Sequence, residues 1–235
     1  MDPSFDRLAR VYHVLEFAAF GHDLERARFC LLDRLASCAR ILVFGEGDGR
    51  ALARLVGIAR HAQIHCIEVS PAMIARASRR LGEADRARVI FHQVDALASS
   101  LPDGPFDAVT TMFFLDCFTE PQVRSLVTKI AATLAPEAAW LWADFRLPDR
   151  GWWRLRARAS IALLYAFFRW QTGIPARQLP PAERLISDAG FTPREHLDRQ
   201  GGMVRTRLFG RSLTGRTAVT SNVCVRDVSP DAAPS

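Results

Sequence analysis

The sequence predicts an α/β fold with a doubly wound, mostly parallel seven-stranded sheet that ends in an antiparallel hairpin. From residue 41 to residue 145, apolar runs typical of buried strands alternate with amphipathic helical segments, which indicates parallel strands covered on both faces. Two later β-like runs are separated by residues 199–202, RQGG, which have the composition of a hairpin turn. The 235 residues, 49% of them hydrophobic, suffice for one full core.

The N-terminal part of the chain is predicted to be helical. Residues 5–20 and 23–36 carry apolar side chains at spacings of three and four and are separated by Gly21. We then expect strands at 41–45, 63–69 and 87–94, with helices at 50–60 and 70–81. Pro71 suits the first turn of the second of these helices.

The second half continues the alternation and then departs from it. We expect strands at 106–114 and 138–145 with a helix at 120–134 between them. Residues 146–180 follow as a helical insertion, with a Trp- and Arg-rich helix at about 152–170. A helix at 181–190 then leads to hairpin strands at 191–198 and 203–210.

These elements predict one domain over residues 1–211. Residues 1–38 form an N-terminal helical lid, and residues 146–180 form an insertion on the substrate side. Residues 212–235 lack sustained periodicity and end in small, polar and proline residues, so we expect a partly disordered tail.

The composition limits the classes of function. The net charge is +6, and thirteen arginines against five acidic residues between Arg146 and Arg211 place about +8 in the C-terminal half. No apolar run has the length of a membrane span and the N-terminus lacks a signal-peptide core, so we expect a cytoplasmic protein. Five cysteines without a C-x-x-C pair indicate neither a disulfide framework nor a structural zinc site.

The stretch ILVFGEGDGR, residues 41–50, carries the strongest functional signal. Gly45, Gly47 and Gly49 follow a strand and open a helix, which removes side chains where a ligand can approach the backbone. A dinucleotide fingerprint would need glycine at the position of Arg50, and a P-loop would need Gly-Lys-Ser/Thr. Glu46 and Asp48 repel a pyrophosphate and attract an ammonium or sulfonium, so the loop predicts a cationic nucleoside.

With Glu68 and Asp95 at the ends of the next two strands, the residues resemble the Rossmann-like class I S-adenosylmethionine-dependent methyltransferases over about residues 40–145. The resemblance implies S-adenosyl-L-methionine as cofactor. It also implies that Glu68 accepts hydrogen bonds from the ribose hydroxyls and Asp95 accepts one from the adenine amino group. The implied cofactor-binding set is Gly45, Glu46, Gly47, Asp48, Gly49, Glu68, Val69, Met73, Asp95 and Ala96.

One position departs from the family pattern. The family usually has an acidic residue two positions before the first glycine, where this chain has Val43. Glu46 and Asp48 are both candidates to replace it in binding the methionine ammonium, and the sequence does not distinguish them. Glu68 and Asp95 each have a structural alternative to a cofactor role. Glu68 could cap the following helix, and Asp95 could stabilise a turn.

Two further segments match members of the family that act on small molecules. FDRLARVYH, residues 5–13, is similar to the F-D-x-x-A-x-x-Y opening of the ubiquinone/menaquinone biosynthesis methyltransferase group. In that group this helix closes over the cofactor, so Tyr12 is expected to contact it, with a core tyrosine as the alternative. FDAVTTMFFLDCF, residues 106–118, is similar to the family's fourth strand and places Phe113 and Asp116 on the acceptor side.

Methyl transfer requires little of the protein beyond positioning, because the sulfonium of the cofactor already makes the methyl group electrophilic. A general base is optional, and His13, His92 and Asp116 are candidates without a motif that selects one. A structural role is the alternative for each, so the catalytic residues stay undetermined at this point.

The helix at 152–170 bears on the acceptor. It is compatible with lining a site for a lipophilic or aromatic acceptor, and with resting on an anionic membrane through its arginines and tryptophans. A plain packing helix is the third alternative. We therefore predict a small lipophilic acceptor and allow for peripheral membrane contact.

Two other functions stay open. An RNA or protein methyltransferase agrees with the basic C-terminal half, although no RNA-binding module or N/D-P-P-Y-like motif is evident and no nucleic-acid partner is expected. A non-catalytic relative that binds the cofactor or a partner protein agrees with Val43. The sequence gives no prediction of oligomeric state.

Overall fold

The computed structural model describes residues 22–148, 151–152, 154–158, 161 and 178–211. The predictions for the first N-terminal helix, for Tyr12 and His13, for most of 159–177 and for the tail at 212–235 lie outside these residues. The strands of one seven-stranded sheet are β1 (Arg40–Phe44), β2 (Gln63–Glu68), β3 (Val89–Gln93), β4 (Phe106–Met112), β5 (Leu134–Phe145), β6 (Phe191–Arg199) and β7 (Val204–Arg211).

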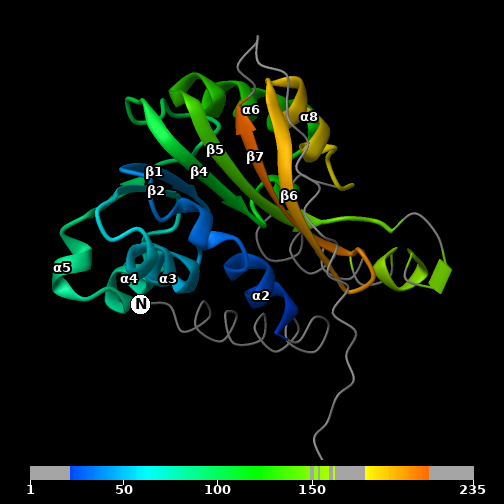
Figure 1. Cartoon of the computed structure of the whole chain (residues 1–235), viewed down its shortest axis with the longest axis horizontal. Coiled ribbons are helices and arrows are strands. Elements are labelled where there is room, and N and C mark those ends of the chain that lie inside the picture. Colours follow the sequence, from blue (N-terminus) through cyan, green and yellow to red (C-terminus); the bar gives the residue numbers. More distant parts are fainter. Residues whose placement is uncertain (1–21, 149–150, 153, 159–160, 162–177, 212–235) are drawn as a thin grey trace, which may run out of the picture.

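The sheet has the order β3-β2-β1-β4-β5-β7-β6 (Figure 1). β1 pairs in parallel with β2 and β4, and β7 runs antiparallel to both β5 and β6. The mostly parallel sheet with an antiparallel C-terminal hairpin is therefore confirmed. The chain leaves β1 towards β2 and β3 and returns to β4, so the order reverses between β1 and β4. Open α/β sheets bind ligands at such a switch point, beyond the carboxyl ends of the strands.

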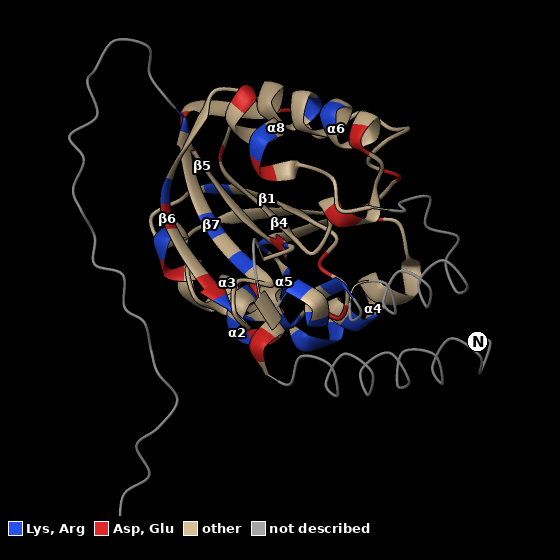
Figure 2. Ribbon diagram, turned by 90° about the vertical axis from the view of Figure 1, so that its right-hand side faces the viewer, with Lys and Arg blue, Asp and Glu red and all other residues tan. Residues whose placement is uncertain are grey.

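Helices cover both faces of the sheet. Those described are α2 (Asp23–Phe29), α3 (Arg50–Ile58), α4 (Pro71–Arg80), α5 (Glu83–Arg86), α6 (Glu120–Thr133) and α8 (Ala182–Asp188), with 3₁₀ turns η1 (Leu32–Leu35) and η2 (Leu115–Cys117). α6 and α8 lie on one side, and α2, α3 and α4 lie on the other (Figure 1). Figure 2 shows the same two layers from a second direction.

The sequence explains where the main helices begin. The Ser70 hydroxyl accepts a hydrogen bond from the Met73 N–H at 3.3 Å, and Pro71 occupies the first turn of α4. At α6 the Gln122 side chain accepts a hydrogen bond from the Thr119 N–H at 2.9 Å, as in a capping box. These caps satisfy backbone donors at the helix ends and hold both helices in register with the strands that precede them.

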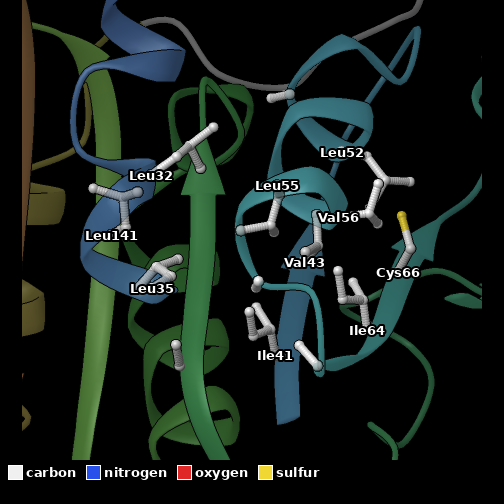
Figure 3. Packing of buried hydrophobic residues seen from close by; sticks show 14 of the residues in the cluster. Leu32, Leu35, Ile41, Val43, Leu52, Leu55, Val56, Ile64, Cys66 and Leu141 are labelled. Atoms are coloured by element: carbon white, nitrogen blue, oxygen red, sulfur yellow. The ribbon is translucent and has the colours of Figure 1, made fainter. Parts of the chain in front are cut away.

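Two apolar cores hold the layers together. On the α3 side, Ile41 and Val43 of β1 pack with Leu52, Leu55 and Val56 of α3 (Figure 3). On the other side, Leu42 and Phe44 pack with apolar residues of α6 and α8, among them Val123, Leu126, Val127, Ile130, Leu185 and Ile186. β1 is thus buried on both faces, which explains its continuous apolar run.

The structure corrects the predicted segment 23–36 and the predicted start of β5, and it adds one short helix. The segment 23–36 is not one helix, because α2 ends at Phe29 and η1 begins at Leu32. Leu31 and Leu32 are both buried, and a continuous α-helix would point these neighbours about 100° apart. β5 begins at Leu134 rather than 138, across a register shift that accommodates Pro136. The short α5 was not predicted.

A part of the insertion is also described. Residues 151–152, 154–158 and 161 are helical, and we call them the insertion helix. Its buried residues Ala157 and Ile161 form a third apolar cluster with Leu24 and Ala27 of α2 and with Met203 and Val204, and Phe113 and Phe145 pack against it. Within the described part of the chain, no helix has the length and apolarity needed to cross a bilayer.

Candidate active site

The glycine-rich loop connects β1 to α3 at the carboxyl edge of the sheet. Gly45, Gly47 and Gly49 have φ of 59°, 65° and 84°, in the region that only glycine adopts readily. A Cβ on Gly49 would lie 2.4 Å from the Ala77 Cα of α4, and one on Gly45 would lie 2.5 Å from the Phe114 ring. A Cβ on Gly47 would meet no atom within 4 Å. The outer glycines thus allow close packing, whereas the middle one faces open space.

Glu46 lies at the mouth of α3. Its Oε1 accepts a hydrogen bond from the Leu52 N–H at 2.7 Å, which satisfies one of the free donors of the first helical turn. Burial raises the pKa of the Glu46 carboxyl to about 7, although this hydrogen bond and the Arg28 guanidinium both act to lower it. The group is therefore poised to change charge near neutral pH and to ionise when a cation approaches.

Asp48 has a different environment. Its carboxylate pairs with Arg80 of α4 at 3.1 Å and with the Nε of Arg50 at 3.0 Å. The Arg80 Nε also donates to the Asp48 carbonyl oxygen at 2.6 Å. Of the two carboxylates that the sequence offers for a ligand ammonium, Asp48 is already compensated by arginines, and Glu46 is the better placed.

Glu68 ends β2 beside this loop. Its Oε1 accepts the Ser70 N–H at 2.9 Å, so the carboxylate also supports the turn into α4. The Gly45 N–H donates to the carbonyl oxygen of Ile67 at 3.1 Å, which joins the glycine loop to the end of β2. Val69 is exposed and Met73 lies one turn into α4. The structure therefore brings Glu68, Val69 and Met73 to the edge that the glycine loop occupies.

The end of β3 carries the next predicted pair. Asp95 is exposed, and its Oδ1 accepts the Leu97 N–H at 2.8 Å in a local turn. Ala96 is buried, and its carbonyl oxygen accepts from Lys129 of α6 at 2.9 Å. The only lysine of the chain is thus used to hold this loop, with further bonds to the carbonyls of Leu97 and Ser99.

The segment that follows β4 forms the other side of the switch point. Phe113 has a φ of 52°, which is uncommon for a residue with a side chain. Its ring packs 5.1 Å from that of Phe145, and the Arg28 guanidinium of α2 lies 4.9 Å from its centroid. Phe113 therefore joins the ends of β4 and β5 to the helix that precedes the sheet.

Asp116 forms a buried pair with Asp144 at the end of β5. The two side chains are 8% and 2% exposed and hydrogen-bond to each other. Burial raises the pKa of both carboxyls, that of Asp116 to about 6, and the proton that Asp144 donates lowers the pKa of Asp116. A hydrogen bond between two carboxyls requires a proton, so Asp144 holds it and Asp116 carries the charge. Asp144 also accepts from the Trp142 indole at 3.2 Å.

Comparison with known proteins decides the family. The family model described as "Methyltransferase domain" matches residues 41–137. Demethylmenaquinone methyltransferase of Thermus thermophilus is 33% identical over 149 residues, which cover 63% of this chain and 66% of that protein.

Solved structures share the fold. A mitomycin 7-O-methyltransferase superposes with a TM-score of 0.62 at 18% identity, over 82% of this chain and 55% of that one. The N-methyltransferase NodS from Bradyrhizobium japonicum WM9, in complex with S-adenosyl-L-homocysteine, superposes with a TM-score of 0.56 at 18% identity. The match covers 80% of this chain and 87% of that one. The chain belongs to the class I S-adenosylmethionine-dependent methyltransferases. It spans about half to two thirds of the length of the first relatives that it matches.

In this methyltransferase the histidine candidate that the structure describes, His92, lies away from the acceptor side. The His92 ring stacks on His65 at 5.1 Å between centroids, and His65 in turn meets Phe106 at the start of β4. This arrangement turns the His92 ring towards the amino ends of the strands, away from the glycine loop. Of the three candidate bases, Asp116 is the one that the described residues place beside the switch point.

Two residues of the methyltransferase site were missed from the sequence. Arg28 lies close enough to influence the charge of both Glu46 and Asp116, and nothing in its local pattern predicts this because the contact is between distant segments. Asp144 had a usable signal, since it is an acidic residue within the apolar strand segment AAWLWADF. A carboxyl in such a strand must be paired or protonated.

Proposed function

We propose that this chain transfers a methyl group from S-adenosyl-L-methionine to a small, apolar acceptor. The observation that carries the proposal is the position of Glu46, Gly47 and Glu68 around one end of β1 and β2, with open space in front of the middle glycine. A cofactor with an ammonium, a sulfonium and a ribose finds a matching group for each part in this set.

The residues fit the cofactor as follows. The backbone at Gly45 and Gly47 would lie against the methionine part, with Glu46 accepting from its ammonium. Glu68 would accept from the ribose hydroxyls, and the turn at Asp95 and Ala96 would hold the adenine. Asp48 contributes by fixing the loop through Arg50 and Arg80. When bound, the cofactor supplies an electrophilic methyl group.

The acceptor side is argued from the cluster that Leu24, Ala27, Ala157, Ile161, Met203 and Val204 form with Phe113 and Phe145, here called the acceptor-side cluster. It joins the lid, the insertion and the ends of β4 and β5 with apolar side chains, which favours an apolar acceptor. Relatives are named for acceptors as different as demethylmenaquinone and trans-aconitate, so their names do not select one.

Asp116 is proposed to orient the acceptor and to take its proton. With Asp144 holding the shared proton, Asp116 presents a carboxylate that accepts a hydrogen bond from an acceptor hydroxyl or amine. Asp116 would take the proton that the acceptor's oxygen or nitrogen loses when it gains the methyl group, and the Asp116–Asp144 pair would then be neutral. A neutral pair is favoured over a charged one in a medium of low dielectric constant.

The RNA methyltransferase alternative loses part of its support. Arg205 pairs with Asp198 and Glu183, Arg207 pairs with Glu183, and Arg211 donates to three main-chain carbonyls at the end of α6 and the start of β5. These arginines of β7 hold the fold together and compensate acidic neighbours. The basic excess of the C-terminal half is therefore a weaker indication of a phosphate ligand than the sequence implies.

Peripheral membrane contact through the insertion helix is part of the proposal. Trp152 and Leu155 are 71% and 64% exposed on a helix that also exposes Arg154 and Arg158, which is a pattern suited to anionic headgroups. Co-sedimentation with phosphatidylglycerol vesicles tests it. Binding that the double change Arg154→Glu with Arg158→Glu abolishes supports the contact, and absence of binding by the natural sequence refutes it.

Calorimetric titration with S-adenosylhomocysteine tests the cofactor site before an acceptor is known. We expect Glu68→Ala to weaken binding by about 1 to 3 kcal/mol, because the ribose loses a charged hydrogen-bond partner. Glu137→Ala is the matched control, because Glu137 is an exposed carboxylate on β5. Equal affinities for the two variants would place the ribose elsewhere, and no binding by the natural sequence would refute the proposal. Transfer of labelled methyl to a panel of acceptors then separates an enzyme from a non-catalytic relative.

A further inference from the structure

Gln200 occupies a strained position in the turn between β6 and β7. It has a φ of 53°, and Gly201 and Gly202 follow with 61° and 87°. Three successive left-handed residues are expected of glycine, and the first of them here carries a long side chain. The hairpin alone gives no reason for glutamine at this position, so the reason must lie in what its side chain contacts.

Both ends of the Gln200 amide are used by other segments. Its Nε2 donates to Asp23 Oδ2 at 2.7 Å, at the first residue of α2. Its Oε1 accepts from Arg156 Nη1 of the insertion helix at 2.8 Å. Both bonds involve a charged partner and are partly buried, which places them among the stronger hydrogen bonds of proteins. One amide therefore links segments that lie 177 and 44 positions away in the chain.

The two linked segments also meet in the acceptor-side cluster. α2 contributes Leu24 and Ala27, and the insertion helix contributes Ala157 and Ile161. α2 has seven residues and no side-chain cap, so its position depends on tertiary contacts rather than on its own helical stability. Besides the bridge, Thr206 of β7 donates to the Ala27 carbonyl oxygen at 2.8 Å. Gln200 is thus the element that orients α2 and the insertion helix together.

We propose that Gln200 is a positioning residue that couples α2 to the insertion helix and thereby sets the arrangement of the acceptor-side cluster. For the acceptor, this inference rests on the proposed function. α2 also reaches the cofactor side, because Glu25 pairs with Arg50 at 3.5 Å and Arg28 lies near Glu46. The bridge itself lies beside the acceptor-side cluster, so its loss is expected to act more strongly on the acceptor side than on the glycine loop.

Hydrogen exchange of the full chain followed by mass spectrometry tests the coupling. Gln200→Gly removes the amide and suits the left-handed backbone, so the hairpin is preserved. We expect exchange in 23–29 and in 151–158 to rise together by about 10- to 100-fold, as the loss of charged hydrogen bonds predicts. A smaller change is expected in β2, residues 63–68, which belongs to the sheet and to neither of the linked helices. Unchanged exchange in both helices, or a rise in only one, would overturn the coupling.

A rescue experiment separates coupling from a local effect. Gln200→Glu alone places a second carboxylate against Asp23 and is expected to loosen both helices. Asp23→Asn combined with Gln200→Glu restores the bridge with donor and acceptor exchanged, and both helices are expected to regain their protection. Failure of the double variant to recover would refute the bridge as the cause. Binding of S-adenosylhomocysteine is measured in the same four proteins. Absence of binding by the natural sequence would count against the proposed function and not against the bridge.

Discussion

Glu46 provides a prediction in which the free energy of unfolding and ligand binding depend on one carboxyl. Burial raises the pKa of this group from an ordinary 4.5 to about 7 in the folded chain. A raised carboxyl pKa means that the folded state holds the proton more tightly than the unfolded state does. The associated stability is fully present below pH 4.5 and is lost as the pH rises through 7. At 1.36 kcal/mol per pH unit the loss amounts to about 3 kcal/mol.

Glu46→Gln removes this loss and keeps a carbonyl oxygen for the Leu52 N–H. Because Glu46 is only partly buried by its neighbours, we expect the variant to be more stable than the natural sequence by about 2 kcal/mol at pH 8 and about equal to it at pH 5. Urea unfolding at the two pH values measures this difference. Asp48→Asn is the matched control, because its ion pairs with Arg50 and Arg80 should make it lose up to about 1 kcal/mol at pH 8.

The same carboxyl links pH to the ligand. If the ammonium of S-adenosylhomocysteine lies against Glu46, binding favours the ionised form, so affinity rises with pH up to about 7 and a proton is released below it. Titrations in phosphate and in Tris at pH 6.5 reveal the proton through the difference in heat. If Glu46→Gln is more stable than the natural sequence but ligand binding to the natural sequence releases no proton, the ammonium of the ligand does not lie against Glu46. A variant that loses stability at pH 8 would refute the buried, protonated state itself.

Two further predictions concern packing and the carboxyl pair. Gly49→Ala is expected to lower the free energy of unfolding by about 2 to 4 kcal/mol, because it combines a left-handed φ with overlap on Ala77. Gly57→Ala, in the last turn of α3 where an added Cβ meets no atom within 4 Å, should raise it by about 0.5 to 1 kcal/mol. Thermal or urea unfolding of the two variants checks this, and equal effects would contradict it. Asp144→Asn should reduce the fall in stability that the natural sequence shows as the pH rises through about 6, because one raised carboxyl pKa is removed. Urea unfolding at pH 5 and pH 8 measures the fall, and an unaltered fall in the variant would show that the pKa of Asp144 is not raised in the folded chain.

The mostly parallel sheet and its antiparallel hairpin could be predicted because each element carries a local signal that agrees with the tertiary structure. β1 reads as a continuous apolar run because it is buried on both faces, and Pro71 and Gln122 mark the first turns of α4 and α6. The two glycines of the turn at 199–202 predict a hairpin and therefore an antiparallel pair of strands. Where local and tertiary requirements differ, prediction was wrong. The segment 23–36 has helical periodicity, yet burying both Leu31 and Leu32 divides it.

The residues of the candidate site likewise fall into those that local sequence predicts and those that it does not. Glu46, Gly47 and Glu68 could be placed from sequence because they sit at strand ends, and parallel strands end at one edge. Arg28, Asp144 and Gln200 act through partners that are far away in the chain, and their roles follow from the packing of α2 and the hairpin. Glu46 itself was predicted only as one of two alternatives, since the arginines that compensate Asp48 come from two different helices, the start of α3 and the end of α4.

The valine that departs from the family pattern is a consequence of how this chain packs α3. Val43 is 1% exposed and lies with Leu55 and Val56 between β1 and α3 (Figure 3). A carboxylate at this position would be surrounded by apolar side chains and would have to be paired or protonated. Three residues later, Glu46 lies where the first turn of α3 offers free N–H groups and where Arg28 is near. A carboxyl moved from the strand to the loop therefore allows close apolar packing beneath the glycines while a negative charge stays available above them, which is the arrangement that a cationic ligand requires.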